Sequence, residues 1–270
     1  MVSNIKNGEI MLSVERLRRI RDFLLEYKHV DVITLSTMLS VSEPTIRKDL
    51  EKLESEGIIQ RVHGGATLIE DDSSFSVNGE SDDVYLLEKQ SIAETAEKLI
   101  QDGEVIFLGQ GSICTFIAKS IKNKKNITLI TNNIHILYEI GFVPNINLIM
   151  TGGKVEKSGN DLYMSGSLSE GILENVLINK AFFTVDGISD KYGYTLKDVD
   201  QKTFYMRVVN ISNLNIVVAE YAKFDKTSLI QFLPLDSINT IITNENIQAE
   251  YKKILFEKGI QLFTSSISNI

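Results

Sequence analysis

The chain has 270 residues, 43% of them hydrophobic, so it is long enough for two domains and apolar enough to bury a core. Its net charge of −8 disfavours unspecific coating of nucleic acid and leaves only a localised DNA site possible. One cysteine excludes an internal disulfide framework, and no 18-residue apolar run or signal pattern occurs, so we expect a cytoplasmic protein without a membrane segment.

The N-terminal segment predicts two short helices before a third. Between residues 13 and 27 one helical face is apolar, and the four arginines of that stretch, Arg16 among them, fall mostly outside it. Asp31 is placed to cap a second helix over residues 32–39. The turn Ser40-Val41 then leads directly into the third helix, which gives a helix-turn-helix.

The third helix is the most informative segment. Ser42 is a suitable N-cap, Pro44 falls in the first turn, and one apolar stripe follows, formed by Ile46, Leu50 and Leu53. Thr45, Arg47 and Lys48 project from the other faces. A short helix that carries a hydroxyl and two cations near its start suits entry into the major groove of DNA.

A β-hairpin is predicted directly after this helix. Gly57 is placed to end the helix, and two short strands flank the turn Gly64-Gly65. Arg61 and His63 share one face of the first strand, where they are candidates for contact with the DNA backbone. We therefore predict a winged helix-turn-helix over residues 1–69.

An acidic, Ser-rich linker is predicted over residues 70–84, followed by an α/β domain over residues 85–270. Short apolar runs bounded by polar loops are typical of a mainly parallel, Rossmann-like sheet buried on both faces. Strands are predicted at residues 105–108, 127–131, 146–151, 181–185, 216–219, 240–243 and 261–264. Helices are predicted at residues 89–100, 114–122, 134–140 and 249–258.

Polar and glycine-rich loops follow five of these strands. Since the carboxyl ends of parallel strands meet at one edge, we expect these loops to bind a small polar, anionic ligand there. The candidate residues are Gly109, Gly111, Ser112, Thr131, Asn132, Gly152, Gly153, Lys154, Gly166, Asp186, Gly187 and Lys223. No nucleotide P-loop and no dinucleotide fingerprint is present, so no cofactor is predicted.

These motifs together resemble the DeoR-type bacterial transcriptional regulators. In the first domain the resemblance is carried by Val41-Ser42-Glu43, Thr45-Ile46-Arg47-Lys48-Asp49-Leu50, Leu53-Glu54, Gly57, Arg61 and His63-Gly64-Gly65-Ala66. In the second it is carried by Lys89 with Ile92-Ala93, Gly111-Ser112, Thr131-Asn132, Gly152-Gly153, Gly166, Lys180-Ala181-Phe182, Asp186-Gly187-Ile188, Gly193 with Thr195, and Lys223-Phe224.

The resemblance implies a third helix that reads operator DNA and a wing that touches its backbone. It also implies an effector domain similar to sugar-phosphate isomerases, in which Lys223 contacts an anion and Asp186 the sugar hydroxyls. Ser42, Thr45, Arg47, Lys48, Arg61, His63 and Gly64 are then the candidate DNA-binding residues. Lys48 replaces the family's second arginine and loses its bidentate fork, so we assign it a phosphate contact.

The chain departs from the family pattern in the effector domain. The acidic Ser/Thr-rich loop becomes Gly109-Gln110-Gly111-Ser112-Ile113, the usual Glu and Lys of a later helix become Thr203 and Tyr205, and Glu220 replaces an aspartate. These changes alter the residues that would bind the sugar. They also remove an acid–base pair that isomerase catalysis requires.

The resulting hypothesis is a repressor of a carbohydrate-uptake or catabolic operon that binds double-stranded operator DNA and is released by a sugar phosphate. A symmetric operator requires a homodimer or homotetramer. The alternatives are a sugar-phosphate isomerase-like enzyme with an interaction domain, and a scaffold whose winged helix binds protein. With three His and one Cys, no metal site is predicted, and Cys114 is either a packed thiol or a redox sensor.

Overall fold

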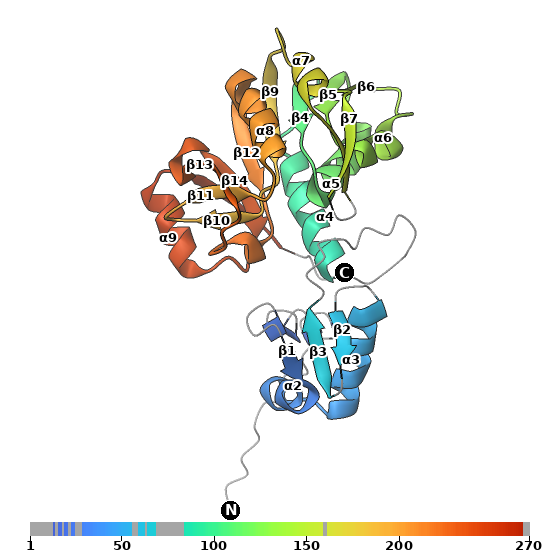
Figure 1. The fold of residues 1–270 in the computed structure, drawn as a ribbon, viewed down its shortest axis with the longest axis vertical. Helices are drawn as coiled ribbons and strands as arrows, with labels where there is room; N and C mark the ends of the chain where they lie inside the picture. The colour runs from blue at the N-terminus through green and yellow to red at the C-terminus, as the bar shows by residue number, and fades with distance from the viewer. Residues whose placement is uncertain are drawn as a thin grey trace, which may run out of the picture. The chain divides into compact units, whose positions relative to one another are not determined.

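A computed structural model describes residues 13, 16–17, 19–20, 23–24, 29–55, 59–62, 64–68, 84–158 and 161–266. The chain divides into two compact units, Met1–Val84 and Tyr85–Ile270 (Figure 1). The predicted linker falls almost wholly outside the described residues, as does Gly57.

The first unit contains the predicted helix-turn-helix. Its elements are β1 (His29–Asp31), α2 (Val32–Leu39), α3 (Glu43–Ser55), β2 (Ile59–Val62) and β3 (Gly65–Leu68), preceded by helical residues between 13 and 24. Asp31 caps α2 by accepting a hydrogen bond from the backbone N–H of Thr34 at 2.8 Å. The buried side chains of the three helices include Leu17, Leu35 and Leu50, which form a small common core.

The strand β1 was not predicted. It pairs antiparallel with β3, so the wing is a three-stranded sheet of order β1-β3-β2. Gly65 makes this pairing possible, because a side chain there would overlap the carbonyl oxygen of Val30. Gly64 and Gly65 were predicted to form a turn, and Gly65 has a second role as a site of close approach between strands.

The second unit is an α/β domain around a seven-stranded sheet, as predicted. Every pairing in that sheet is parallel, in the order β15-β14-β12-β9-β4-β5-β6. The strands are β4 (Val105–Leu108), β5 (Ile127–Thr131), β6 (Ile146–Met150), β9 (Ile178–Phe183), β12 (Ser212–Val218), β14 (Thr240–Asn244) and β15 (Gln261–Ser265). The helices are α4 (Val84–Glu97), α5 (Ser112–Ser120), α6 (Ile134–Ile140), α7 (Ser167–Gly171), α8 (Val199–Ile211) and α9 (Ala249–Glu257).

Smaller elements outside that sheet were missed. A hairpin joins β7 (Lys154–Ser158) to β8 (Asp161–Ser165), and a second sheet has the order β10-β11-β13. The strands of that second sheet are β10 (Gly187–Ser189), β11 (Gly193–Leu196) and β13 (Ile230–Leu233). None of these five strands is a bounded apolar run, since polar residues or glycine occur in each of them, so the sequence carried no clear signal for them.

The strand order places a topological switch point between β4 and β9. From β4 the chain continues to β5 and β6 on one side, whereas β9 and the strands after it lie on the other. Ligands of open α/β sheets bind at such a point, outside the carboxyl ends of the strands. An aromatic cluster from the sheet and α8 packs near it, and Tyr205 contacts Phe183 in this cluster with ring centroids 4.9 Å apart.

Candidate DNA-binding surface and effector site

The start of α3 is fixed by Ser42, as predicted. The carbonyl oxygen of Ser42 accepts hydrogen bonds from the backbone N–H groups of Thr45 and Ile46 at 3.0 and 3.1 Å. The hydroxyl groups of Ser42 and Thr45 lie 2.8 Å apart and share a hydrogen bond. Two of the predicted DNA-binding residues therefore form one hydroxyl pair at the beginning of the recognition helix.

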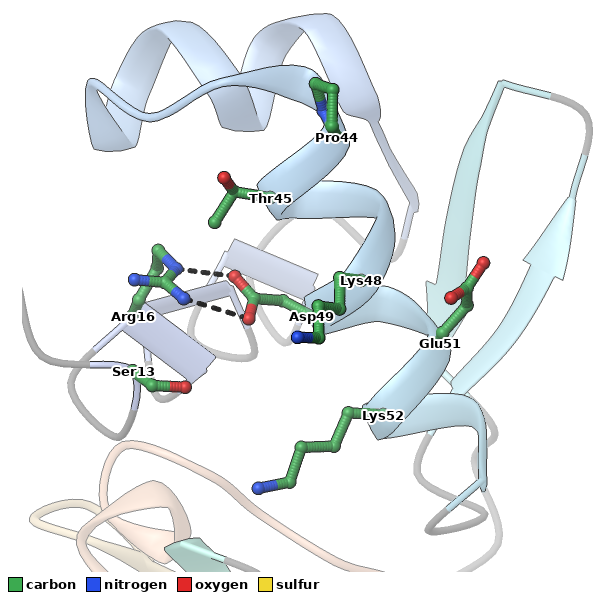
Figure 2. Close-up of a pocket in the computed structure, with 8 residues that line it drawn as sticks. All are labelled: Ser13, Arg16, Pro44, Thr45, Lys48, Asp49, Glu51 and Lys52. Carbon is green, nitrogen blue, oxygen red and sulfur yellow. Dashed lines mark hydrogen bonds and ion pairs between the residues drawn. The ribbon is translucent and has the colours of Figure 1, made fainter.

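One side of α3 borders a groove of about 910 Å³. Figure 2 shows Lys48 and Lys52 one turn apart on this side of the helix, with Arg16 across from them. The groove is lined by Ser13, Arg16, Pro44, Thr45, Lys48, Asp49, Glu51 and Lys52. Lys52 was missed in the sequence analysis, although its spacing of four residues from Lys48 places it on the same helical face.

Arg16 connects the first helix to α3 in this groove. Its Nε and Nη2 atoms donate hydrogen bonds to the two carboxylate oxygens of Asp49 at 2.5 and 3.0 Å. The side chains are only 13% and 7% exposed, so Arg16 packs between the first helix and α3, although the arginines of its segment were expected mostly outside the apolar face. The hydrogen bond to Asp49 raises the pKa of Arg16 above its ordinary value. Because the pair spans 33 positions of sequence, no local pattern indicated it.

On another charged side of α3, the helix residue Arg47 and Arg61 of the neighbouring strand β2 contact glutamates of the helix. Arg47 is exposed and lies 3.3 Å from Glu43 of the same helix. Arg61 of β2 donates to Glu54 through Nε at 2.7 Å and through its backbone N–H at 3.0 Å, and to Glu51 through Nη1 at 2.9 Å. These hydrogen bonds raise the pKa of Arg61 and lower that of Glu54.

The remaining wing residues are only partly described. Gly64 lies in the exposed turn between β2 and β3 with φ +87°, a left-handed conformation that favours glycine. His63 lies outside the described residues.

In the second unit, the loops after β4 and β5 are joined by hydrogen bonds. The Nδ2 atom of Asn133 donates to the carbonyl oxygens of Gly109 and Gly111, each at 3.4 Å, and to the Thr115 hydroxyl at 3.2 Å. The Thr131 hydroxyl donates to the carbonyl oxygen of Leu108 at 2.6 Å. Asn133 therefore holds the two loops together, although it was not among the predicted effector-site residues.

Tyr205 reaches the same loop from α8. The backbone N–H of Gln110 donates to its hydroxyl oxygen at 2.9 Å, and a Cβ atom on Gly109 would lie 2.5 Å from that oxygen. The Thr184 hydroxyl donates a hydrogen bond to the carbonyl oxygen of Gln110 at 2.8 Å. Tyr205 is fully buried, and burial raises the pKa of its phenol. One N–H group of the predicted anion-binding loop is thus already bonded within the protein.

Two buried polar atoms at these strand ends lack a hydrogen-bond partner in the described part of the chain. They are Nε2 of Gln110, which follows β4, and Oδ1 of Asn132, which follows β5. Ser112 begins α5 after Gly111, and the Gly111 cap has no side-chain hydrogen bond. Within the described residues, one amide donor and one amide acceptor close to the start of α5 are therefore left without a partner.

The candidate residues after β6 lie close to the turn that precedes α7. The Thr151 hydroxyl accepts a hydrogen bond from Ser169 at 2.7 Å, and a side chain on Gly153 would overlap the carbonyl oxygen of Ser165. Gly152 and Gly166 both have positive φ angles. Lys154 begins β7 instead of the loop, and its exposed ammonium group lies 2.6 Å from Glu156, which raises its pKa.

The last three candidates surround the small sheet. Asp186 accepts a hydrogen bond from the backbone N–H of Lys197 at 2.8 Å, and Lys197 Nζ lies 3.7 Å away. Gly187 belongs to β10, where a Cβ atom would lie 2.6 Å from the carbonyl oxygen of Lys226. Lys223 ends the 3₁₀ turn η2 (Tyr221–Lys223), next to Glu220, which forms an ion pair with Lys89 at 3.6 Å.

Cys114 is a packed thiol. It is fully buried, its Sγ atom lies 3.7 Å from the carbonyl oxygen of Phe182, and burial raises its pKa to about 12. A protonated, inaccessible thiol is unsuited to redox sensing. Among the described residues, no three His, Cys, Asp or Glu side chains group as metal ligands, and no helix is long and apolar enough to cross a bilayer.

Comparison with known proteins decides the family. A DeoR-like helix-turn-helix domain matches residues 16–72, and the DeoR C terminal sensor domain matches residues 86–245. The chain belongs to the DeoR family. It is a DNA-binding transcriptional regulator, as its first unit predicted.

Full-length relatives support this assignment. The chain is 30% identical to the HTH-type transcriptional regulator YulB of Bacillus subtilis over 96% of this chain and 99% of that protein. It is 30% identical to a putative aga operon transcriptional repressor of Escherichia coli over 92% of each chain. It is 29% identical to the repressor GlcR of Bacillus subtilis over 94% of this chain and 97% of that protein.

Proposed function

We propose that this regulator represses an operon for carbohydrate uptake or catabolism and leaves its operator when a phosphorylated sugar binds at the carboxyl edge of the sheet. The observation that carries the proposal is the combination of a DeoR recognition helix with two unpartnered buried amide atoms beside the switch point of the sheet. Two similar full-length proteins are named as repressors, one of them of the aga operon.

On the DNA side, we assign base recognition to Arg47 and phosphate contacts to Lys48, with Ser42 and Thr45 at the helix start. Arg47 is exposed, its pairing with Glu43 is long, and its guanidinium can form two parallel hydrogen bonds to guanine. Lys48 borders the groove beside α3 and offers a point charge. Two copies of the chain would occupy the two halves of a symmetric operator.

On the effector side, we assign ligand contacts to the unpartnered atoms of Gln110 and Asn132 and to the start of α5 at Ser112. A sugar hydroxyl both donates and accepts hydrogen bonds, which matches one amide donor and one amide acceptor. The backbone N–H groups at Gly111 and Ser112 are suited to the phosphate. Asp186 and Lys223 remain our candidates for further contacts with the sugar and the anion.

We also propose that the domain is not an isomerase. Isomerisation needs a positioned acid and base, and two helix positions where the family pattern has charged residues are uncharged here. The Thr203 hydroxyl donates to the carbonyl oxygen of Val199 at 3.2 Å, and burial holds Tyr205 in its protonated form. Conversion of any pentose or hexose phosphate by the purified protein would contradict this assignment.

The test is binding of the purified full chain to DNA from upstream of its own gene, titrated with a panel of sugar phosphates at one fixed salt concentration. We expect tight binding that one compound relieves. Arg47→Ala should weaken this binding by about 2 kcal/mol and relax sequence preference at one position. Binding that no sugar phosphate relieves would overturn the effector assignment, and absence of specific DNA binding would overturn the repressor assignment.

A further inference from the structure

Arg61 lies on the outer edge of the wing, against the recognition helix. Among the described strands, its strand β2 pairs with β3 alone, so the backbone N–H groups on its other side have no described strand partner. One of these, the N–H of Arg61, donates to Oε1 of Glu54, while the Arg61 side chain donates to Oε2 of the same carboxylate. Glu54 therefore binds both the strand edge and the side chain, and Glu51 binds the end of the guanidinium group.

This arrangement is poorly suited to contact with a DNA phosphate. Glu54 and Glu51 already engage Nε and Nη1 of the Arg61 guanidinium at 2.7 and 2.9 Å, and their negative charges would repel a phosphate that approached the same group. The charges on this side of α3 and the wing are Glu43, Glu51 and Glu54 against Arg47 and Arg61, an excess of one negative charge. By contrast, Lys48 and Lys52 line the groove beside α3 together with the Arg16–Asp49 pair, and Glu51 borders both this groove and Arg61.

We infer that Arg61 acts in DNA binding as a positioning residue, which holds the wing against the recognition helix through Glu54 and Glu51. This assignment replaces the phosphate contact that the sequence suggested for it. The wing contacts DNA elsewhere, and Arg61 sets the distance between the wing and α3 that allows both to reach the duplex at once. The inference rests on DNA binding by this family, and is independent of the operon and effector proposed above.

The test uses the full chain and a duplex that the wild-type protein selects from a random-sequence pool. Dissociation constants are measured by fluorescence anisotropy over a series of salt concentrations for Arg61→Lys, Arg61→Gln, Glu54→Gln and the Glu54→Gln/Arg61→Gln double variant. We expect each single variant to weaken binding about fivefold, close to 1 kcal/mol. The double variant should bind DNA no more weakly than the weaker of its two single variants, because Arg61→Gln, Glu54→Gln and their combination all break the same contact.

The salt dependence separates positioning from phosphate contact. If Arg61 positions the wing, the slope of log Kd against log salt stays at the wild-type value in all four variants. Lys48→Gln is the matched control, and should reduce that slope by about one unit, as loss of a phosphate contact does. Arg61→Lys is informative because lysine keeps the charge but loses the fork that holds Glu54 and Glu51.

The opposite results would overturn the inference. If Arg61 instead binds a phosphate, Arg61→Gln should reduce the salt slope by about one unit and Arg61→Lys should keep most of the affinity for DNA. Glu54→Gln should then bind DNA as tightly as the wild type or more tightly, because a competing carboxylate is neutralised. Thermal unfolding of each variant controls for folding. The isosteric Glu54→Gln change, whose direction of effect differs between the two roles, decides the question even if Arg61→Gln is unstable.

Discussion

Polar side chains are exposed on the recognition helix but buried at the carboxyl edge of the sheet. On α3, the candidate DNA contacts are at the surface: the Arg47 side chain is 58% exposed, and it pairs loosely with Glu43. At the sheet edge, the polar residues are buried and bonded to the protein backbone, as with Thr131 and Asn133, which are at most 1% exposed.

This difference follows from the size of the two ligands. DNA is a large, preformed polyanion, so a protein needs surface cations held on a rigid frame to bind it. A small molecule must be enclosed by groups that are fixed in advance, since it has few atoms with which to order them. Substitutions on α3 should therefore change affinity more than stability, whereas substitutions at the sheet edge should change stability first.

The largest effect is expected at Gly109. The Gly109 backbone approaches Tyr205 closely, and alanine would place a methyl group 2.5 Å from the hydroxyl oxygen and 3.0 Å from the ring carbon that bears it. Because both groups are packed in the interior, Gly109→Ala should destabilise the second unit by about 3 kcal/mol. Differential scanning calorimetry of the full chain measures this change as a lower transition temperature.

Tyr205→Phe provides the matched control for that overlap. Alone it should cost about 1–2 kcal/mol, since the N–H of Gln110 loses its acceptor. Combined with Gly109→Ala it should restore part of the lost stability, because the nearest overlapping atom is removed. If the stability losses of the two single variants simply add in the double variant, a methyl group at position 109 does not overlap the Tyr205 hydroxyl as the geometry indicates.

The main elements of both units could be predicted because their signals are local. Ser42, Pro44 and the stripe ending at Leu53 lie within one short segment, and together they define a helix start and its buried face. Each of the seven strands of the large sheet contains a short apolar run, which is how a buried parallel strand differs from its surroundings. The short strand β1 had no such run, and its pairing depends on Gly65, more than 30 positions away.

The connections within the candidate sites could not be predicted, because they join residues that are distant in sequence. The Arg16–Asp49 pair spans 33 positions, and the bond between Gln110 and Tyr205 spans 95. Sequence patterns identified polar loops at strand ends but not which of their atoms are already bonded. The burial of Arg16 appeared only in the structure for the same reason. Arg61 lies only seven and ten positions from its two glutamates, but it is on a different element, and the sequence does not show how β2 lies against α3.

The Arg16–Asp49 pair allows a buried charge pair to be compared with an exposed one within the first unit. Asp49→Asn should destabilise this unit by about 2 kcal/mol, because a mostly buried guanidinium loses a carboxylate that accepts two hydrogen bonds. Glu43→Gln removes the exposed pairing with Arg47 and should cost less than about 0.5 kcal/mol. Chemical unfolding of both variants gives the two free energies, and equal values would contradict a structural role for the buried pair.

Among these tests, substitution of Cys114 should have the smallest effect on the pH dependence of stability at neutral pH, and a defined effect in alkali. Because the folded protein raises the pKa of this thiol to about 12, a thiol-specific reagent at pH 8 should label it only after unfolding and should leave DNA binding unchanged. Below the unfolded pKa of about 8.5 the thiol is protonated in both states, so it adds no pH dependence. Between about pH 8.5 and 12 the unfolded chain releases this proton and the folded chain keeps it, so stability falls with rising pH. Cys114→Ala should lack this one-proton contribution in unfolding measured across that range, and rapid labelling of the native protein would show that the thiol is accessible after all.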